Sequence, residues 1–243
     1  MRARQHTSQY PARPGGNGEC PSAVYLDAFD HKVLGYGETL ICFSSTAQMK
    51  AENGGLRIPT AVDMGCGAGA MAQALGRAGL NVTAVDLNPP EGEESFYHHA
   101  VIGRVSYKQA NFQRIDYQTL PPLIDIFYSQ RALHYVPFAA AKNLLQSVSS
   151  RFPNRGVLAI SVLGVNSPIV KHADWRHNPI EQRFGKIPAF DANRWNITRR
   201  VCPYTQQDLV DLASDLGLRV SSLRSTRFGI IKAILMKDPV KFR

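Results

Sequence analysis

The sequence contains no long apolar run and no cluster of cysteines. Its longest apolar stretch, 157–163, is far shorter than the roughly 20 residues that cross a bilayer. The N-terminal segment carries charges and prolines but lacks the apolar core of a signal peptide. The four cysteines are far apart, with neither a C-x-x-C pair nor histidines at ligand spacing, which argues against a zinc site and a disulfide framework. We therefore expect a cytoplasmic protein with no membrane partner.

Metal-ligand patterns are missing elsewhere too. We interpret His98 and His99 as a surface pair on a helix, because no third ligand stands at metal spacing. No run of five like charges occurs, although the net charge is +9. An excess of positive charge favours anionic partners such as nucleic acid, an acidic small substrate or a membrane surface. The other interpretation, that it is solvated surface charge without a binding role, stays open.

A chain of 243 residues has the length of one α/β domain. Residues 1–22, rich in Pro, Gly and Arg, predict a flexible arm. Residues 23–243 form the expected single domain, and 23–57 within it an N-terminal helical cap of one or two helices, broken near Gly35 and Gly37.

From residue 60 onward, short apolar strands alternate with helices, the pattern of a parallel sheet with helices on both faces. The last two strands are separated by only a few residues, so they should pair antiparallel. We predict an α/β fold with a Rossmann-like, seven-stranded, mostly parallel sheet whose last strand is reversed. The expected strands are 60–64, 81–87, 105–110, 123–130, 156–164, 218–225 and 229–237, and the expected helices are 70–79, 139–152 and 205–217.

A glycine-rich turn, "MGCGAGA", joins the first of these strands to the first helix. Such a turn lets the backbone pass close to a nucleotide at the helix N-terminus, and its G-x-G-x-x-A spacing also fits NAD-dependent enzymes. Asp63, two residues before the first glycine, would repel a pyrophosphate but would favour a cationic ligand. Asp86 ends the next strand, where a carboxylate can accept from both ribose hydroxyls. An adenosine with a cationic, phosphate-free substituent fits both acids.

Several motifs in order, "VDMGCGAG", "VTAVDLNP", "KQANF" and "IDIFYSQRALHYV", resemble those of class I S-adenosylmethionine-dependent methyltransferases, of the bacterial, small-molecule type. The resemblance covers about residues 58–237 and includes the reversed last strand. It implies S-adenosylmethionine as cofactor, S-adenosylhomocysteine as product and no metal. The text "SQRA" departs from the N/D-P-P-Y/F tetrad of the enzymes that methylate amino groups of DNA bases.

Carried over residue by residue, the resemblance implies a set of cofactor-binding positions. Asn111 stands where the family more often has an acid, but its amide carbonyl can still accept from the adenine amino group. Cys66 is interpreted as a small filler in the turn rather than as a nucleophile. The implied positions are Asp63, Gly65, Cys66 and Gly67 at the methionine end, Asp86 at the ribose, Leu87, Asn111 and Phe112 at the adenine, and Ser129 and Gln130 beneath the methyl group.

Three residues after the fourth expected strand are the catalytic candidates: Arg131, His134 and Tyr135. His134 is the first candidate for a general base, since histidine titrates near neutral pH. A structural role for His134 is equally compatible with the sequence. Arg131 either holds an anionic substrate or pairs with a surface carboxylate.

Residues 164–203 lack clear periodicity and are longer than an ordinary connection, which predicts a lid-like insertion. They hold seven Lys or Arg against three Asp or Glu, together with Trp175 and Trp195. Aromatic rings among cations suit a planar anionic or heteroaromatic acceptor, or an unpaired RNA base. The two tryptophans can equally serve to anchor the insertion on the body.

The leading hypothesis is therefore a methyltransferase acting on a small-molecule substrate. The alternative is an RNA or protein methyltransferase that docks through a basic surface, including Arg2, Arg4, Arg13, Arg199 and Arg200. A third possibility is a cofactor-binding scaffold or regulator without turnover. The sequence contains no recognisable RNA-binding module, which favours the first hypothesis.

Overall fold

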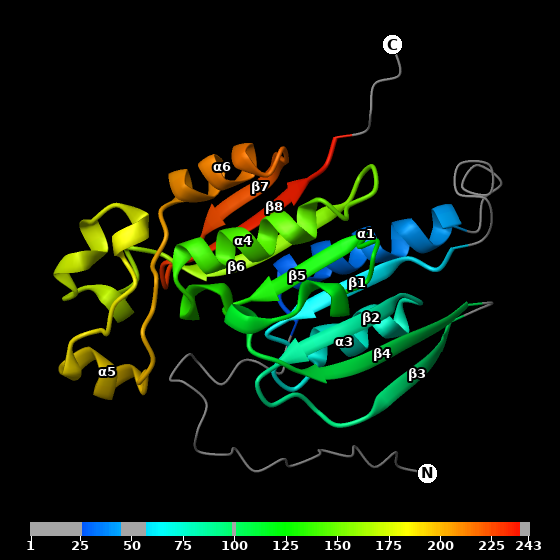
Figure 1. The fold of residues 1–243 in the computed structure, drawn as a ribbon, viewed down its shortest axis with the longest axis horizontal. Coiled ribbons are helices and arrows are strands. Elements are labelled where there is room, and N and C mark those ends of the chain that lie inside the picture. The colour runs from blue at the N-terminus through cyan, green and yellow to red at the C-terminus, as the bar shows by residue number, and fades with distance from the viewer. Residues whose placement is uncertain (1–25, 45–56, 99–100, 239–243) are drawn as a thin grey trace, which may run out of the picture.

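The computed structural model describes residues 26–44, 57–98 and 101–238, and in this part of the chain eight strands form one sheet (Figure 1). The predicted arm at 1–22 lies outside the described residues. The strand order is β3-β4-β2-β1-β5-β6-β8-β7. The strands are β1 (Thr60–Met64), β2 (Asn81–Asp86), β3 (Glu93–His98), β4 (Val101–Gln109), β5 (Ile126–Gln130), β6 (Val157–Leu163), β7 (Arg219–Ser225) and β8 (Ile230–Met236).

The centre of the sheet is parallel, as predicted, and its last strand in the chain is reversed. β4, β2, β1, β5 and β6 run in one direction, whereas β8 is antiparallel to both β6 and β7. β1 lies between β2 and β5 and is parallel to both. The loops that follow these three strands therefore lie next to one another at the same edge of the sheet. A ligand site at the carboxyl ends of parallel strands follows from this arrangement.

β3 is the strand that the sequence-based prediction missed. It forms the sheet's outer edge and pairs antiparallel with β4. Its side chains alternate between solvent and partial burial, with Glu93 and Ser95 exposed and Glu94 and Phe96 half-buried. An edge strand of this polarity lacks the apolar run that marked the others. The prediction that His98 lies on a helix was wrong, since His98 is the last residue of β3.

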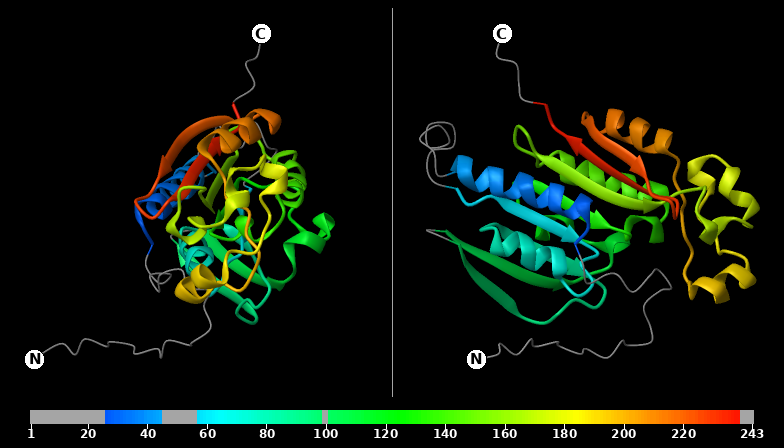
Figure 2. Two further views of the ribbon diagram at one scale, coloured as in Figure 1. Left: turned by 90° about the vertical axis from the view of Figure 1, so that its left-hand side faces the viewer. Right: turned by 180° about the vertical axis from the view of Figure 1, so that it is seen from behind.

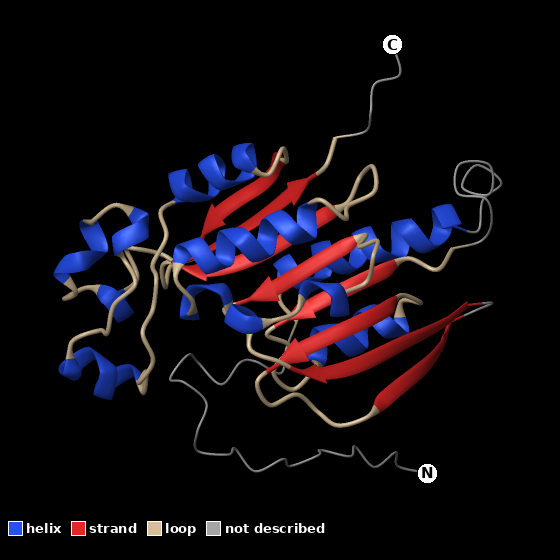
Figure 3. Cartoon of the chain, in the orientation of Figure 1, coloured by secondary structure: helices blue, strands red, loops and turns tan. Residues whose placement is uncertain are grey.

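Helices cover both faces of the sheet, as predicted (Figures 2 and 3). α1 (Ala28–Ser44) and α3 (Ala70–Arg77) lie on one face, and α4 (Phe138–Ser149) and α6 (Gln206–Asp215) on the other. Each face buries its own apolar cluster, one around Leu75 and Ile126 and the other around Phe127 and Leu158. No described helix has the length and hydrophobicity needed to cross a membrane.

α1 runs through Gly35 and Gly37 without interruption, so the predicted break there was wrong. Glycine weakens a helix by only about 1 kcal/mol, which packing readily offsets. A Cβ atom on Gly37 would lie 3.2 Å from Leu80 Cδ1 and 3.5 Å from Leu75 Cδ2. Gly37 therefore lets α1 approach the body closely. Gly35 has no heavy atom within 4 Å of the corresponding position.

The segment 164–203 projects from the carboxyl edge of the sheet as short 3-10 turns and helix α5 (Ala189–Trp195) (Figure 1). Its apolar residues form a small cluster with Leu163 of β6 and Ile230 of β8, in which Ile169, Val170 and Val201 are fully buried. Its two ends are joined, because Val165 N donates to Tyr204 O at 2.9 Å and Tyr204 N donates to Leu163 O at 2.8 Å. The segment is therefore an ordered wall above the strand ends.

The two helical glycines of α1 offer a matched test. Gly35→Ala should stabilise the protein by about 0.5–1 kcal/mol, because alanine gains helix propensity where space is open. Gly37→Ala should gain less or destabilise, because its methyl group crowds Leu80. Urea unfolding of both variants measures the difference, and equal effects of the two substitutions would contradict this account of the α1 packing.

Candidate functional site

A cavity of about 520 Å³ opens at the carboxyl ends of β1, β2, β4 and β5, under the segment 164–203. Its walls come from the turns after these four strands and from the second half of the insertion. The lining residues are Gly65, Asp86, Leu87, Asn88, Asn111, Phe112, Gln113, Gln130, Arg131, Ala132, Tyr135, Val136, Phe184, Arg199 and Arg200.

The glycine-rich turn supplies the floor nearest to β1 and β2. Gly65, Gly67 and Gly69 all have positive φ, at 81°, 52° and 80°, a region that side chains disfavour. The turn is held by Asp86, whose Oδ2 accepts from Gly67 N at 3.0 Å and whose Oδ1 accepts from Asn88 N at 3.1 Å. A carboxylate offers about four acceptor positions, so Asp86 keeps capacity for a ligand in the cavity.

The turns after β1 and β5 press directly against each other. A Cβ atom on Gly65 would lie 2.3 Å from Ala132 Cβ, a distance that real atoms do not adopt. Beside Ala132, Arg131 has a positive φ of 53°, which is costly for a residue other than glycine. The Arg131 amide donates to Ser161 O and Ser161 Oγ, each at 3.0 Å. These bonds hold Arg131 where its side chain lines the cavity.

Asp63 lies beneath the glycine-rich turn and does not line the cavity. Only 2% of it is exposed. The pKa of Asp63 is raised to about 7, chiefly because the carboxyl group is buried; a hydrogen bond from the Ala72 backbone lowers the pKa, and the nearby Asp86 and Asp30 carboxylates raise it. The site thus contains a buried acid whose charge depends on pH near neutrality.

The predicted adenine-binding residues lie on the side of the glycine-rich turn, where Phe112 Cζ would be 3.1 Å from a Cβ atom on Gly65. Leu87, Asn111 and Phe112 all line it. The Leu87 carbonyl accepts from Gln109 Nε2 at 2.8 Å, which fixes the strand tip. Asn111 Oδ1 accepts from Gln113 N at 3.0 Å and so begins the short 3-10 turn Phe112–Arg114. The Asn111 side-chain carbonyl therefore has a structural hydrogen bond in addition to its predicted binding role.

Of the predicted catalytic residues, Arg131 and Tyr135 line the cavity and His134 does not. His134 is fully buried, and its Nδ1 accepts from Leu163 N at 3.3 Å. Its backbone carbonyl accepts from Cys202 N at 2.7 Å, which ties this turn to the end of the insertion. This placement fits the structural role that the sequence left open for His134.

Three more of the predicted cofactor residues do not line the cavity. Ser129 is fully buried in β5, and among the described residues its Oγ has no hydrogen-bond partner. Cys66 is half-buried, and burial raises the pKa of its thiol well above the usual range, which agrees with its interpretation as a filler. The backbone N–H of Gly67 donates a hydrogen bond to the Asp86 carboxylate. Of the residues predicted at the methionine end and beneath the methyl group, Gly65 and Gln130 are the ones that line the cavity.

The insertion contributes an aromatic and cationic part of the lining. Phe184, Arg199 and Arg200 come from the insertion, and Arg200 lies over the Phe184 ring with its guanidinium carbon 4.8 Å from the centroid. Arg200 also donates to Phe184 O at 2.6 Å. Arg199 and Arg200 were predicted by name for docking and were among the insertion's predicted cations, whereas Phe184, in the text "EQRFGK", was not predicted.

Trp175 and Trp195 do not line the cavity, so they do not form its aromatic wall. Trp175 Nε1 donates to Lys186 O at 3.2 Å, and the Trp175 ring packs against Gly185. Trp195 forms an edge-to-face pair with Phe228 at 5.1 Å. Trp195 therefore contacts the body, as in the alternative that the sequence left open, whereas these contacts of Trp175 lie within the insertion.

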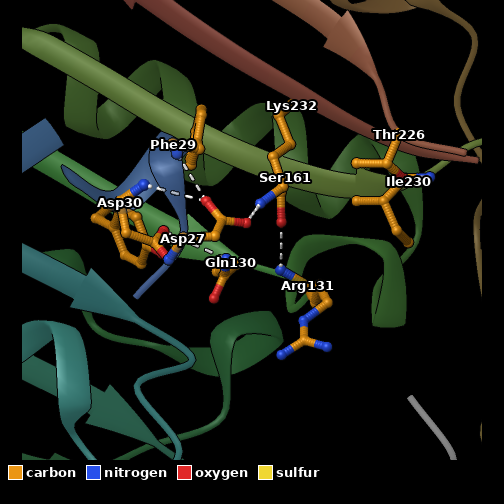
Figure 4. Close-up of polar contacts among 10 residues, drawn as sticks. Asp27, Phe29, Asp30, Gln130, Arg131, Ser161, Thr226, Ile230 and Lys232 are labelled. Atoms are coloured by element: carbon orange, nitrogen blue, oxygen red, sulfur yellow. Dashed lines mark hydrogen bonds and ion pairs between the residues drawn. The ribbon is translucent and has the colours of Figure 1, made fainter. Parts of the chain in front are cut away.

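The N-terminus of α1 reaches the same end of the sheet through a network of acids (Figure 4). Asp30 is almost fully buried and accepts from Tyr128 OH at 2.5 Å and from Gln130 Nε2 at 3.3 Å. The neighbouring Asp27 forms an ion pair with Lys232 of β8. No described cluster of histidine, cysteine, aspartate and glutamate could hold a metal ion.

Comparisons with known proteins agree with this architecture. A family model described as a methyltransferase domain matches residues 42–223. A search of curated proteins found no match to the sequence.

Solved structures share the fold at low identity. An S-adenosylmethionine-dependent methyltransferase from Methanosarcina mazei is 18% identical, with 75% of this chain and 93% of that chain covered and a TM-score of 0.52. One from Mesorhizobium loti is 16% identical, with 74% and 91% covered and a TM-score of 0.52. A putative one from Listeria monocytogenes is 15% identical, with 84% and 99% covered and a TM-score of 0.51. At these identities the likeness bears on the fold alone.

The buried Asp63 predicts a pH-dependent stability. Its pKa rises on folding from 3.8 to about 7. Below pH 3.8 the group is protonated in both the folded and the unfolded protein, and the free energy of unfolding is highest. It falls as the pH rises through about 7, because the buried carboxyl resists ionisation in the folded protein. Asp63→Asn should gain stability relative to the unmodified protein, by up to a few kcal/mol, between about pH 4 and about pH 8. Urea unfolding at both pH values tests this, with the exposed Glu91→Gln as the control that shows no such trend.

Proposed function

The chain belongs to the class I S-adenosylmethionine-dependent methyltransferases, and we propose that it transfers the cofactor's methyl group to a small, anionic or heteroaromatic acceptor. The observation that carries the proposal is the polarity of the cavity. Asp86 is the only acid among its described lining residues, and it lies at the glycine-rich end. The cations of that same described lining are Arg131, Arg199 and Arg200.

The glycine-rich end fits the nucleoside part of S-adenosylmethionine. Gly65 leaves no room for a side chain between the turn and Ala132, and this brings bare backbone to the cavity surface. Asp86 keeps acceptor capacity for ribose hydroxyls, and Leu87 and Phe112 offer apolar surface to a base. Asp63 adds buried negative charge below the turn when it is ionised, which favours a cationic ligand over a phosphorylated one.

The acceptor is assigned to the end formed by Arg131, Tyr135, Phe184, Arg199 and Arg200. A guanidinium group binds carboxylates and phosphates through paired hydrogen bonds, and an aromatic ring offers a stacking surface to a planar molecule. Arg200 already stacks on Phe184, so the pair presents charge and a ring together. A planar acid is the acceptor that uses both features.

When bound, S-adenosylmethionine supplies a methyl group on a sulfonium, which an acceptor atom displaces in line. The protein then has to align the acceptor and exclude water rather than activate the methyl group. Arg131 and Tyr135 line the cavity on the chain segment that leaves β5 and are the groups we assign to acceptor alignment. We assign His134 to holding this segment against Leu163 and Cys202 rather than to proton transfer.

An RNA or protein acceptor is the second candidate that the basic composition allows. Arg199 and Arg200 are exposed as well as lining the cavity, so they are accessible to a large anionic partner. Arg2, Arg4 and Arg13 lie outside the described residues. The experiments below separate this alternative from a small acceptor.

Cofactor binding tests the first half of the proposal. S-adenosylhomocysteine should bind the unmodified protein in isothermal titration, and Asp86→Asn should weaken binding by about 10- to 100-fold, because hydrogen bonds to a charged group are lost. Glu91→Gln removes a nearby exposed charge that does not line the cavity and should leave the affinity unchanged. Absence of any binding to the unmodified protein would refute the assignment.

The charge of the methylated product tests the second half of the proposal, which concerns the acceptor. With labelled S-adenosylmethionine and a metabolite extract, the label should appear in small molecules that an anion-exchange resin retains. For the acceptor so identified, Arg199→Gln should raise KM about tenfold with a smaller change in kcat, because an ionic hydrogen bond to the acceptor is lost. Arg194→Gln, on α5 and outside the cavity lining, is the control. Label in RNA or protein, with activity falling steeply with salt, would favour the alternative instead.

A further inference from the structure

We propose that Asp30 of α1 is a positioning residue that orients the Gln130 amide, so that the Gln130 carbonyl oxygen faces the cavity and accepts a hydrogen bond from the cofactor's ammonium group. The inference rests on the proposed function and deepens it. It gives the N-terminal helix a part in recognising the amino-acid portion of S-adenosylmethionine, through a residue that lies 100 positions away in the chain.

The geometry begins with one oxygen atom. Asp30 Oδ1 accepts from Tyr128 OH at 2.5 Å and from Gln130 Nε2 at 3.3 Å, and Asp30 Oδ2 accepts from Asp27 N at 2.8 Å (Figure 4). Gln130 ends β5 and lines the cavity beside Gly65. Only 1% of Asp30 is exposed, so water does not compete for these bonds.

The chemistry of the two groups then decides which amide atom meets the ligand. A carboxylate only accepts, so the Gln130 NH₂ group is the side of the amide that Asp30 favours. The carbonyl oxygen is directed away from Asp30, and Gln130 lines the cavity. An exposed amide oxygen in a partly desolvated site favours an ammonium group, whereas an exposed NH₂ group would repel it.

Contacts at the start of α1 hold Asp30 in place, so that Asp30 can orient the Gln130 amide. Asp27 pairs with Lys232 of β8, and Lys232 Nζ lies 5.1 Å from the centroid of the Phe29 ring. Tyr128 holds Asp30 from the sheet side. These contacts attach the first turn of α1 to β5 and β8 independently of Gln130.

The test compares two ligands by isothermal titration: S-adenosylhomocysteine and its desamino analogue, 5′-S-(3-carboxypropyl)-5′-thioadenosine, which differ only in the ammonium group. The unmodified protein should prefer S-adenosylhomocysteine by about tenfold or more. In Asp30→Asn the new side-chain oxygen accepts from the backbone amide of Asp27, so the Asn NH₂ group faces Gln130 and turns its amide over. That variant should lose most of the preference.

A second substitution should restore what the first removes. In the double variant Asp30→Asn with Gln130→Glu, the Asn NH₂ group donates to one glutamate oxygen and leaves the other toward the cavity. The preference for S-adenosylhomocysteine should return to within about threefold of the unmodified value, with the net charge unchanged. A merely structural role for Asp30 would change both ligands' affinities together, and adding Gln130→Glu would not rescue the preference.

Two further variants separate a loss of recognition from a loss of folding. Gln130→Leu leaves the Asp30–Tyr128 bond in place and should abolish the preference while the desamino analogue still binds. Asp27→Asn weakens the ion pair to Lys232 and should lower stability with the preference unchanged. If the unmodified protein binds both ligands equally, or Gln130→Leu keeps the preference, the inference is overturned and the proposed function stands. If neither ligand binds the unmodified protein, the proposed function itself fails.

Discussion

The contact between the turns after β1 and β5 is the constraint on which the site depends. Gly65 and Ala132 leave no space for another atom between them, so the two turns have a single relative position. That position forces Arg131 into a left-handed conformation, which Ser161 stabilises from β6. Strain of this kind persists only where surrounding structure holds it. The cavity residues that follow β1 and β5 are thereby built on one junction between the two turns.

The charged groups in and around the cavity come from different elements of the chain. The acids Asp63 and Asp86 belong to the first two strands of the parallel sheet, and Asp30 reaches the same region from α1. The arginines come from the turn after β5 and from the insertion. A ligand that is cationic at one end and a partner that is anionic can therefore meet inside a single pocket. The net charge of +9 belongs to the whole chain and does not tell how charge is distributed inside the cavity.

Much of this architecture could be predicted from the sequence because it depends on local pattern. Apolar strands, capped helices and the spacing of Asp63, Asp86 and the glycines are all short-range features. Three elements could not be predicted that way. β3 pairs at an edge with half its surface in solvent, α1 passes through its glycines because packing compensates, and Phe184 enters the cavity by tertiary placement alone.

The candidate site shows the same division between local pattern and long-range contact. Gly65, Asp86, Leu87, Asn111, Phe112, Gln130, Arg131 and Tyr135 were predicted and do line the cavity. Asp63, Cys66, Gly67, Ser129 and His134 were predicted too but lie outside that lining, since strand alternation and the turn geometry direct them elsewhere. The contact of Asp30 with Gln130 joins residues 100 positions apart, and no local pattern signals it.

The joined ends of the insertion have a consequence for how such an enzyme can diversify. The chain leaves the sheet at Leu163 and returns at Tyr204 through adjacent hydrogen bonds, and its apolar residues between these points cluster with Leu163 and with Ile230 of β8. Its interior sequence can change while the strands beneath keep their register. The glycine-rich turn and the lining residues Phe184, Arg199 and Arg200 thus belong to separate parts of the chain, so changes in the insertion can alter this part of the cavity wall without altering the turn.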